Sequence, residues 1–189
     1  MLRNLLGAAA LTLLATAAWA EGDGPGPNLV IDVDGVAKGQ IVIDLSPDLA
    51  PKAVAQIVAL AKSGAYDNVV FHRVIEGFMA QTGDVQYGKM GGDTTMAGMG
   101  GSELPNIPAE FSTAPFDRGI VGMARSSDPD SANSQFVIMF APGDFLNGQY
   151  IVVGKVISGM EVVDLIKRGD GANGEVTEPD LMTKVTVQE

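Results

Sequence analysis

Short stretches of alternating apolar and polar residues occur along most of the chain after residue 27, and this pattern predicts β-strands. Residues 28–34 lead into an Asp34-Gly35 turn, and residues 39–45 alternate with a period of two. We therefore expect these two segments to form an opening hairpin. Further short strands are predicted at residues 69–75, 78–81, 120–124, 135–140, 150–156 and 182–187.

Two other segments have the spacing of amphipathic helices. Pro51 suits a first helical position, and apolar residues recur at helical spacing through residues 52–62, where Ser63-Gly64 ends the pattern. Residues 160–167 predict a second helix, and the glycine-rich residues 83–108 predict a long loop. Many short strands with two well-separated helices favour a mainly antiparallel β-barrel with the helices outside it.

The N-terminus follows a different pattern. Arg3 precedes an apolar run from Leu5 to Ala18, and Ala18-Trp19-Ala20 places small residues at the −3 and −1 positions of a cleavage site. This pattern is typical of a secretory signal peptide. A membrane anchor is the alternative, but about fourteen apolar residues are fewer than the roughly twenty that span a bilayer. We expect a signal peptide at residues 1–20, cleaved after Ala20, a Gly/Pro-rich linker at residues 21–27 and one domain at residues 28–189, with no membrane anchor after cleavage.

Composition and charge exclude several classes of function. The chain has 189 residues, of which 46% are hydrophobic, so it can bury a core and is not expected to be disordered as a whole. The absence of Cys excludes disulfides, thiol nucleophiles and thiolate metal sites. A net charge of −11 argues against nucleic acid as a partner, because phosphate binding needs clustered Lys and Arg.

Few residues remain for conventional catalysis or metal binding. His72 is the only histidine, and a Ser-His-Asp triad would depend on it. The chain has no Gly-x-Ser-x-Gly motif, and neighbouring Arg73 would disfavour the imidazolium that such a base must form. Three loop methionines could bind a soft metal, but without Cys or further His adaptable apolar contacts are favoured; they are Met90, Met96 and Met99. We expect neither a metal nor another cofactor.

The most unusual composition lies in residues 66–84, where Arg73 interrupts an apolar strand and Phe78-Met79-Ala80-Gln81 follows on the next. Taken alone, the pattern is explained by an Arg on a sheet surface whose aliphatic stem lies along apolar neighbours.

The same stretch closely resembles the signature of the cyclophilin family of peptidyl-prolyl cis–trans isomerases. The match runs without a gap from Tyr66 through Phe71-His72-Arg73 and Phe78-Met79 to Gln81 and Gly83. Two further blocks resemble the family in the same order, residues 119–125 with 131–138 and residues 145–156. Together the resemblance covers residues 28–187, and it favours a functional role for Arg73.

The resemblance implies a closed eight-stranded antiparallel β-barrel capped by two α-helices, with a packed interior and a substrate groove on the outer face. The residue pattern is consistent with such a division. In an extended strand Gln135 and Val137 share one face, whereas Phe136, Ile138 and Phe140 lie on the other.

The resemblance also implies roles for individual residues. Arg73 corresponds to the catalytic arginine of the family, and Gln81 would bind the substrate backbone and orient Arg73. His72 matches a family histidine, for which we favour a structural role. The other implied binding residues are Phe78, Met79, Val137 and Leu146 in a pocket for the proline ring, Ala124, Arg125 and Gln135 in a neighbouring subsite, and Phe145 and Tyr150 at the rim.

The chemistry of a prolyl isomerase fits what this chain lacks. Rotation about the peptide bond is opposed by amide resonance, with a barrier of about 18–20 kcal/mol, and no bond is broken. A permanently charged donor such as Arg73 can stabilise the twisted state, in which the nitrogen recovers its lone pair. Two alternatives stay open, a non-catalytic chaperone module that binds proline peptides and a structural protein of the envelope. Arg73 together with Gln81 favours the enzyme.

Three positions depart from many relatives. Val137 replaces a Phe and gives a wider pocket floor, Phe145 replaces the Trp of cyclosporin-sensitive members, and Tyr150 stands where those members often have His. The pattern resembles bacterial exported cyclophilins. We therefore expect a monomeric periplasmic protein that binds cyclosporin weakly and acts on unfolded or flexible proline-containing polypeptides.

Overall fold

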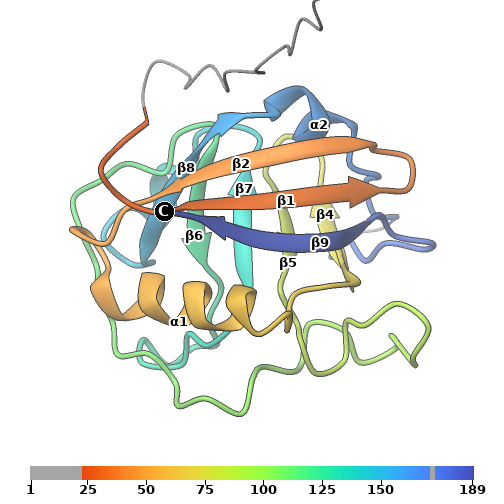
Figure 1. Cartoon of the computed structure of the whole chain (residues 1–189), viewed down its shortest axis with the longest axis horizontal. Helices are drawn as coiled ribbons and strands as arrows, with labels where there is room; N and C mark the ends of the chain where they lie inside the picture. The colour runs from red at the N-terminus through yellow and green to blue at the C-terminus, as the bar shows by residue number, and fades with distance from the viewer. Residues whose placement is uncertain (1–22, 171–172) are drawn as a thin grey trace, which may run out of the picture.

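The computed structural model describes residues 23–170 and 173–189. Within these residues, nine strands form one curled antiparallel sheet, accompanied by two α-helices and a short 3-10 helix (Figure 1). The strands are β1 (Asn28–Asp34), β2 (Gly39–Leu45), β3 (Val69–Val70), β4 (Arg73–Ile75), β5 (Met79–Thr82), β6 (Ile120–Met123), β7 (Phe136–Met139), β8 (Val152–Ser158) and β9 (Leu181–Gln188). The helices are α1 (Pro51–Lys62), η1 (Asp144–Leu146) and α2 (Met160–Leu165).

The predicted signal peptide at residues 1–20 lies outside the described residues, as do the first two residues of the predicted linker. From Asp23 onward the linker has no regular secondary structure. The N–H group of Gly24 donates to the Asp44 carboxylate at 3.0 Å, so this part of the chain contacts β2. In the described part of the chain, no helix is both long and apolar enough to span a membrane.

The order of strands in the sheet is β3-β9-β1-β2-β8-β6-β7-β5-β4, and all neighbouring pairs are antiparallel. The predicted opening hairpin is confirmed, with β1 paired to β2 from Asn28 opposite Asp44 to Val33 opposite Gly39. The first and last strands, β1 and β9, lie side by side.

The expected fold, a mainly antiparallel β-structure with two α-helices, is confirmed. It differs in detail from a closed eight-stranded barrel, since the described residues form a nine-stranded half-barrel whose end strands are β3 and β4. These edge strands come from the segment 69–75, which was predicted to be one strand. Three of its N–H groups bond to carbonyl oxygens outside the strands. Val70 donates to Gly88, Phe71 to Asp180 and Val74 to Gly174, at 2.9, 2.9 and 2.7 Å.

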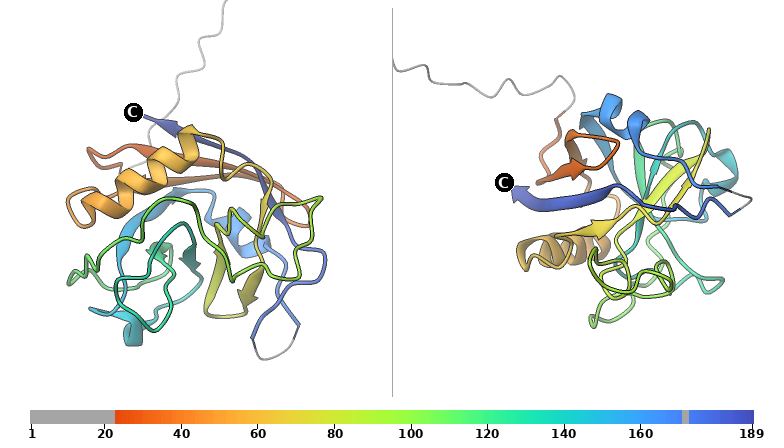
Figure 2. Two further views of the ribbon diagram at one scale, coloured as in Figure 1. Left: turned by 90° about the horizontal axis from the view of Figure 1, so that it is seen from below. Right: turned by 90° about the vertical axis from the view of Figure 1, so that its right-hand side faces the viewer.

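Helix α1 begins at Pro51 as predicted, and its first turn is capped by a distant carboxylate. Glu110 accepts hydrogen bonds from the N–H groups of Lys52 at 3.1 Å and Ala53 at 2.9 Å. Such a cap satisfies amide groups that have no partner within the helix and places negative charge at the positive end of its dipole. The helix packs beside β9. Figure 2 shows the curl of the sheet in two further views.

The predicted long loop is confirmed, because residues 83–108 contain neither a helix nor a named strand. The second helix is shorter than predicted and ends at Leu165, because Ile166 leaves the helical region with φ −55° and ψ 128°.

Two clusters of buried apolar side chains stabilise the fold. The larger one fills the inside of the curled sheet and includes α1 residues such as Val54 and Ile57. A smaller cluster lies on the other face of β5 and β7 and consists of Met79, Phe116, Met139, Leu146 and Val152. The predicted division of β7 is confirmed, because Phe136 and Ile138 belong to the larger cluster and Val137 packs against the smaller one.

Candidate active site

Arg73 and Gln81 face one another on two paired strands at the edge of the sheet. They are register partners in the β4–β5 ladder, and Arg73 Nη1 donates to Gln81 Oε1 at 3.1 Å. Arg73 Nε donates to the carbonyl oxygen of Asn173 at 2.8 Å, and Nη1 also lies 3.9 Å from the sulfur of Met79. The guanidinium is thus held from two sides by groups that come from distant parts of the chain.

The electrostatic environment of Arg73 is that of a half-buried cation. Burial lowers the pKa of its guanidinium, while Tyr150 and Glu175 act in the opposite direction. An arginine starts from so high a pKa that it remains protonated in proteins. The site therefore keeps a positive charge in a partly dry environment, where its interactions are stronger than in water.

Gln81 is the first of two linked side-chain amides. Its Nε2 donates to Gln135 Oε1 at 2.9 Å, and Gln135 Nε2 donates to the carbonyl oxygens of Gly98 at 3.0 Å and Gly100 at 2.7 Å. The hydrogen bonds run from the glycine-rich loop across β7 and β5 to Arg73.

A pocket of about 230 Å³ lies beside the guanidinium. Its apolar floor consists of Met79 and Leu146, which are almost fully buried members of the smaller cluster, and Val137, which is partly buried against that cluster. The lining residues are Arg73, Phe78, Met79, Gln81, Met123, Ala124, Arg125, Val137, Phe145, Leu146 and Tyr150. An apolar floor with a few polar groups at one side is the usual construction of a small-ligand site.

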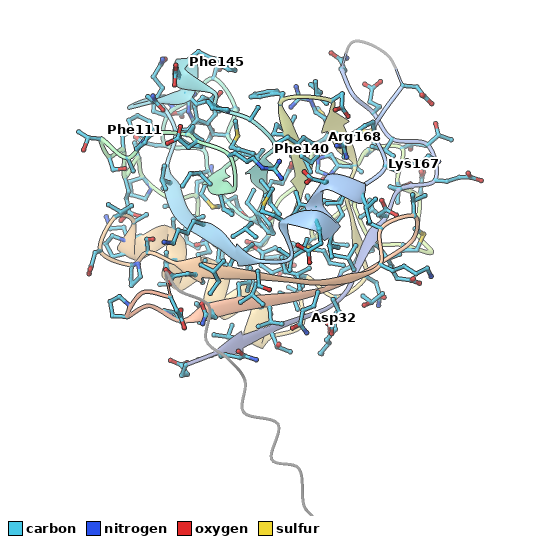
Figure 3. All side chains as sticks on the ribbon, turned by 90° about the horizontal axis from the view of Figure 1, so that it is seen from above. Asp32, Phe111, Phe140, Phe145, Lys167 and Arg168 are labelled. Atoms are coloured by element: carbon cyan, nitrogen blue, oxygen red, sulfur yellow. The ribbon has the colours of Figure 1, made fainter. Side chains whose placement is uncertain are left out.

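The rim of this pocket is aromatic. Phe145 is 66% exposed on η1, and its ring centroid lies 5.3 Å from that of Phe78. Phe145 lies at the surface, on the same side of the molecule as Phe111 and on the side opposite Asp32 (Figure 3). The Arg125 guanidinium lies 4.4 Å from the ring centroid of Tyr150, another lining residue, which gives a cation–π contact at the pocket.

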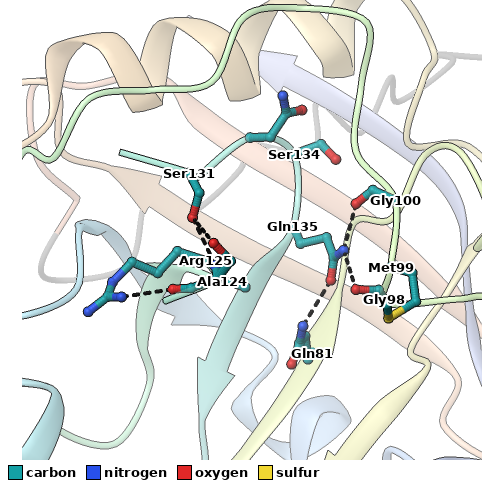
Figure 4. A pocket seen from close by; sticks show the side chains of 11 residues that line it. Gln81, Gly98, Met99, Gly100, Ala124, Arg125, Ser131, Ser134 and Gln135 are labelled. Carbon is teal, nitrogen blue, oxygen red and sulfur yellow. Dashed lines mark hydrogen bonds between the residues drawn. The ribbon is translucent and has the colours of Figure 1, made fainter. Parts of the chain in front are cut away.

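A second pocket of about 300 Å³ continues the first along Gln81, Ala124 and Arg125 (Figure 4). Its other lining residues are Gly98, Met99, Gly100, Ser126, Ser131, Asn133, Ser134 and Gln135. The two pockets form one groove with an apolar half and a polar half.

The structure brings together every residue that the sequence predicted for the site. All but Gln135 line the apolar pocket, and Gln135 lies in the polar pocket next to Gln81, Ala124 and Arg125. His72 lines neither pocket among the described residues, and instead its ring is buried beneath Gly98. Residues 23–170 and 173–189 contain no group of three or more acidic or histidine side chains placed to hold a metal ion.

Sequence reasoning missed several residues of the groove. Asn173 contributes a backbone carbonyl, which leaves no trace in its side-chain type. Gly98 and Gly100 likewise act through their carbonyls, in a loop without periodicity. Met123 could have been found, because it directly precedes the predicted pair Ala124 and Arg125 at the end of β6.

Comparisons with known proteins agree with this geometry. Residues 29–187 match the family described as cyclophilin type peptidyl-prolyl cis-trans isomerase/CLD. A Brucella suis protein named "Probable peptidyl-prolyl cis-trans isomerase" is 53% identical over 190 residues, which cover 99% of this chain and 96% of the relative.

Solved structures show the same fold. A Cryptosporidium parvum cyclophilin type isomerase, crystallised in the presence of the dipeptide Ala-Pro, is 28% identical with a TM-score of 0.73 and covers 86% of this chain and 99% of its own. The cyclophilin AquaCyp293 from Hirschia baltica shares the fold with a TM-score of 0.69 at 24% identity, over 84% of this chain and 73% of its own. With the family match spanning almost the whole described domain, the chain belongs to the cyclophilin-type peptidyl-prolyl cis–trans isomerases.

Proposed function

We propose that this chain accelerates rotation about X-Pro bonds in unfolded or flexible exported polypeptides, with Arg73 as the catalytic residue. The observation that carries the assignment is the guanidinium fixed at the edge of an apolar pocket by Gln81 and Asn173. Within residues 23–170 and 173–189 these bonds use Nε and Nη1, and we propose that Nη2 serves the substrate.

The chemical step is a rotation, and its difficulty lies in the loss of amide resonance. Uncatalysed exchange of an X-Pro bond takes tens to hundreds of seconds. In the twisted transition state the proline nitrogen is no longer conjugated and becomes a hydrogen-bond acceptor. A guanidinium directed at that nitrogen stabilises the twisted state more than either planar state, and such a difference is what lowers the barrier.

The size of the effect requires more than one contribution. An acceleration of about 10⁵-fold corresponds to about 7 kcal/mol. One donor in a water-excluding site is worth about 3–4 kcal/mol. We assign the remainder to the pocket floor of Met79, Val137 and Leu146, which would hold the proline ring while the preceding residue rotates.

The proposed role of Gln81 is to bind the substrate backbone and to keep Arg73 in place. Ala124, Arg125 and Gln135 would contact the residues that precede proline, because they line the continuation of the groove. Phe78 would form one wall of the ring pocket, and Phe145 and Tyr150 would form its rim.

The decisive experiment is a protease-coupled isomerase assay on an Ala-Pro tetrapeptide, with protein that begins at Glu21. The wild type should accelerate isomerisation, and Arg73→Ala should lower kcat/KM by at least about a hundredfold, which is the usual worth of one positioned donor. An unchanged rate in Arg73→Ala would refute the assignment. The alternative function, a proline-peptide-binding chaperone without turnover, is not favoured, because binding alone needs no fixed cation at this place. It would gain support if the wild type bound the peptide without accelerating its isomerisation.

The proposed compartment is the periplasm, on the basis of the signal pattern of residues 1–20. Expressed in a bacterium with two membranes, the full chain should appear in the periplasmic fraction with Glu21 as its N-terminal residue. A chain that keeps Met1 and stays in the cytoplasmic fraction would contradict this. We also propose a monomer, which light scattering at the mass of one chain would support and a larger mass would refute.

A further inference from the structure

A buried carboxylate lies next to the groove without lining either of its pockets in the described part of the chain. Asp84 follows β5 and is 0% exposed. Its Oδ1 accepts hydrogen bonds from the N–H groups of Gln86 at 3.0 Å and Tyr87 at 2.9 Å, and its Oδ2 accepts from those of Gly98 at 2.7 Å and Gly100 at 2.9 Å. One side chain thus ties together two parts of the glycine-rich loop that lie more than ten residues apart.

The same two glycines are the acceptors for Gln135. Their N–H groups face Asp84, while their carbonyl oxygens receive both hydrogen bonds from Gln135 Nε2 (Figure 4). Gly98 adopts φ +100°, and a Cβ at this position would lie 3.1 Å from the ring of His72. The path of residues 98–100 is therefore fixed on one side by Asp84 and on another by the buried ring of His72.

This arrangement determines which way each amide in the groove points. A carbonyl only accepts, so the two loop carbonyls require the NH₂ group of Gln135 to face the loop and its oxygen to face Gln81. Gln81 must then offer its NH₂ group to Gln135 and its oxygen to Arg73. A guanidinium only donates, so the orientation required by the loop agrees with the one required by Arg73.

We propose that Asp84 is a positioning residue for Arg73, acting through residues 98–100, Gln135 and Gln81. In the described residues Asp84 lines neither pocket of the groove and is not hydrogen-bonded to Arg73, and its effect on the reaction is transmitted by the direction of these hydrogen bonds. The proposal rests on the proposed catalytic role of Arg73.

Asp84→Asn is the first test. Asn offers one acceptor atom and one NH₂ group. The NH₂ group must face two backbone N–H groups, which are donors and cannot accept a hydrogen bond from it. Residues 98–100 should move away from residue 84, and kcat/KM on the Ala-Pro tetrapeptide should fall about tenfold. The signal of Arg73 Nε–H in a ¹⁵N NMR spectrum should shift, since its side chain loses its fixed orientation.

Asp93→Asn is the matched control. Asp93 Oδ1 accepts from the N–H and hydroxyl groups of Thr95 at 3.0 and 2.7 Å in the same loop, but it is exposed and does not bond residues 98–100. This variant should keep the wild-type rate and the wild-type Arg73 signal.

A double-mutant cycle separates positioning from a general loss of structure. If Asp84 acts through Gln135, then adding Asp84→Asn to Gln135→Ala should lower kcat/KM by less than twofold. A full tenfold loss in that background, or no loss in the single variant, would overturn the proposal. The proposed function is tested by a different variant. It would be refuted if Arg73→Ala kept the wild-type rate, whatever the result for Asp84→Asn.

Gly100→Ala provides a second route should Asp84→Asn not fold. A Cβ on Gly100 would lie 2.6 Å from Asp84 Oδ1 and 2.7 Å from the ring of Tyr87, so the segment must shift away from the carboxylate. The same loss of rate and the same loss of effect in the Gln135→Ala background are expected. An effect that adds fully to Gln135→Ala would count against the relay.

Discussion

Arg73 and Gln81 are opposed in the β4–β5 ladder, with guanidinium Nη1 3.1 Å from the side-chain oxygen of Gln81. The pairing is a direct consequence of strand register, and it places a fixed cation beside an apolar pocket. Since Gln81 also donates to Gln135, its amide must present its oxygen to Arg73.

Replacing Gln81 by Glu should therefore lower activity although the side chain keeps its shape. The new carboxylate would neutralise the guanidinium and would face the oxygen of Gln135 without a donor. We expect kcat/KM on the Ala-Pro tetrapeptide to fall at least about tenfold. Gln86→Glu makes the same chemical change at an exposed position and should leave the rate unchanged. Activity within twofold of wild type in Gln81→Glu would show that the contact is dispensable.

Phe145→Trp should strengthen binding of cyclosporin. Phe145 is 66% exposed at the rim and offers no hydrogen-bond donor, whereas Trp adds contact area and an indole N–H. We expect a wild-type Kd above micromolar and at least a tenfold tighter Kd in the variant, both measured by calorimetry. A sub-micromolar Kd for the wild type would contradict the sequence-based expectation of weak binding.

Glu110→Ala should reduce stability without affecting the groove. The substitution removes the carboxylate that caps Lys52 and Ala53 at the start of α1. The free energy of unfolding should fall by about 1 kcal/mol, and Tm by about 2–4 °C. Glu103→Ala, at an exposed loop position, is the matched control. Equal urea midpoints for the two variants would rule out a capping role.

The stability of the protein should decrease on acidification because of His72. Burial lowers the pKa of its imidazole below the ordinary value of 6.5, Arg73 lowers it further, and Asp84 opposes the shift. Between the folded and unfolded pKa values the unfolded chain binds more protons, so the free energy of unfolding rises with pH. The contribution of neutral His72 to the free energy of unfolding is thus complete above pH 6.5 and is lost as the pH falls from 6.5 toward the lower pKa of the folded state.

His72→Gln tests this assignment, because the chain has no other histidine. Urea unfolding at pH 5, 6 and 7 should show a smaller dependence on pH in the variant than in the wild type. The same slope in both proteins would mean that other groups cause it.

Most residues of the site were implied by the family resemblance, and short-range sequence patterns predicted how some of them are directed. The alternation in residues 135–140 predicted that Gln135 and Val137 share a face, and the structure places them over the groove with Phe136 and Ile138 in the core. The opening hairpin and the first helix were equally local, since the Asp34-Gly35 turn and Pro51 specify them within a few residues.

The features that escaped prediction depend on backbone groups from distant segments. The segment 69–75 has the composition of one strand, but three of its N–H groups bond to the carbonyl oxygens of Gly88, Asp180 and Gly174. It therefore divides into two short strands at the ends of the half-barrel. In the same way, Asn173 holds Arg73 through its carbonyl oxygen. Contacts of this kind are independent of side-chain type, and sequence patterns carry no signal for them.

The central claim is that Arg73 stabilises the twisted bond and contributes little to ground-state binding of the peptide. The most direct measurement compares the Kd of a non-cleavable Ala-Pro peptide, by NMR titration, with kcat/KM for wild type and Arg73→Ala. We predict a Kd within threefold of wild type together with a rate at least about a hundredfold lower. Equal losses in affinity and rate would mean that Arg73 only binds the substrate, and would contradict the account.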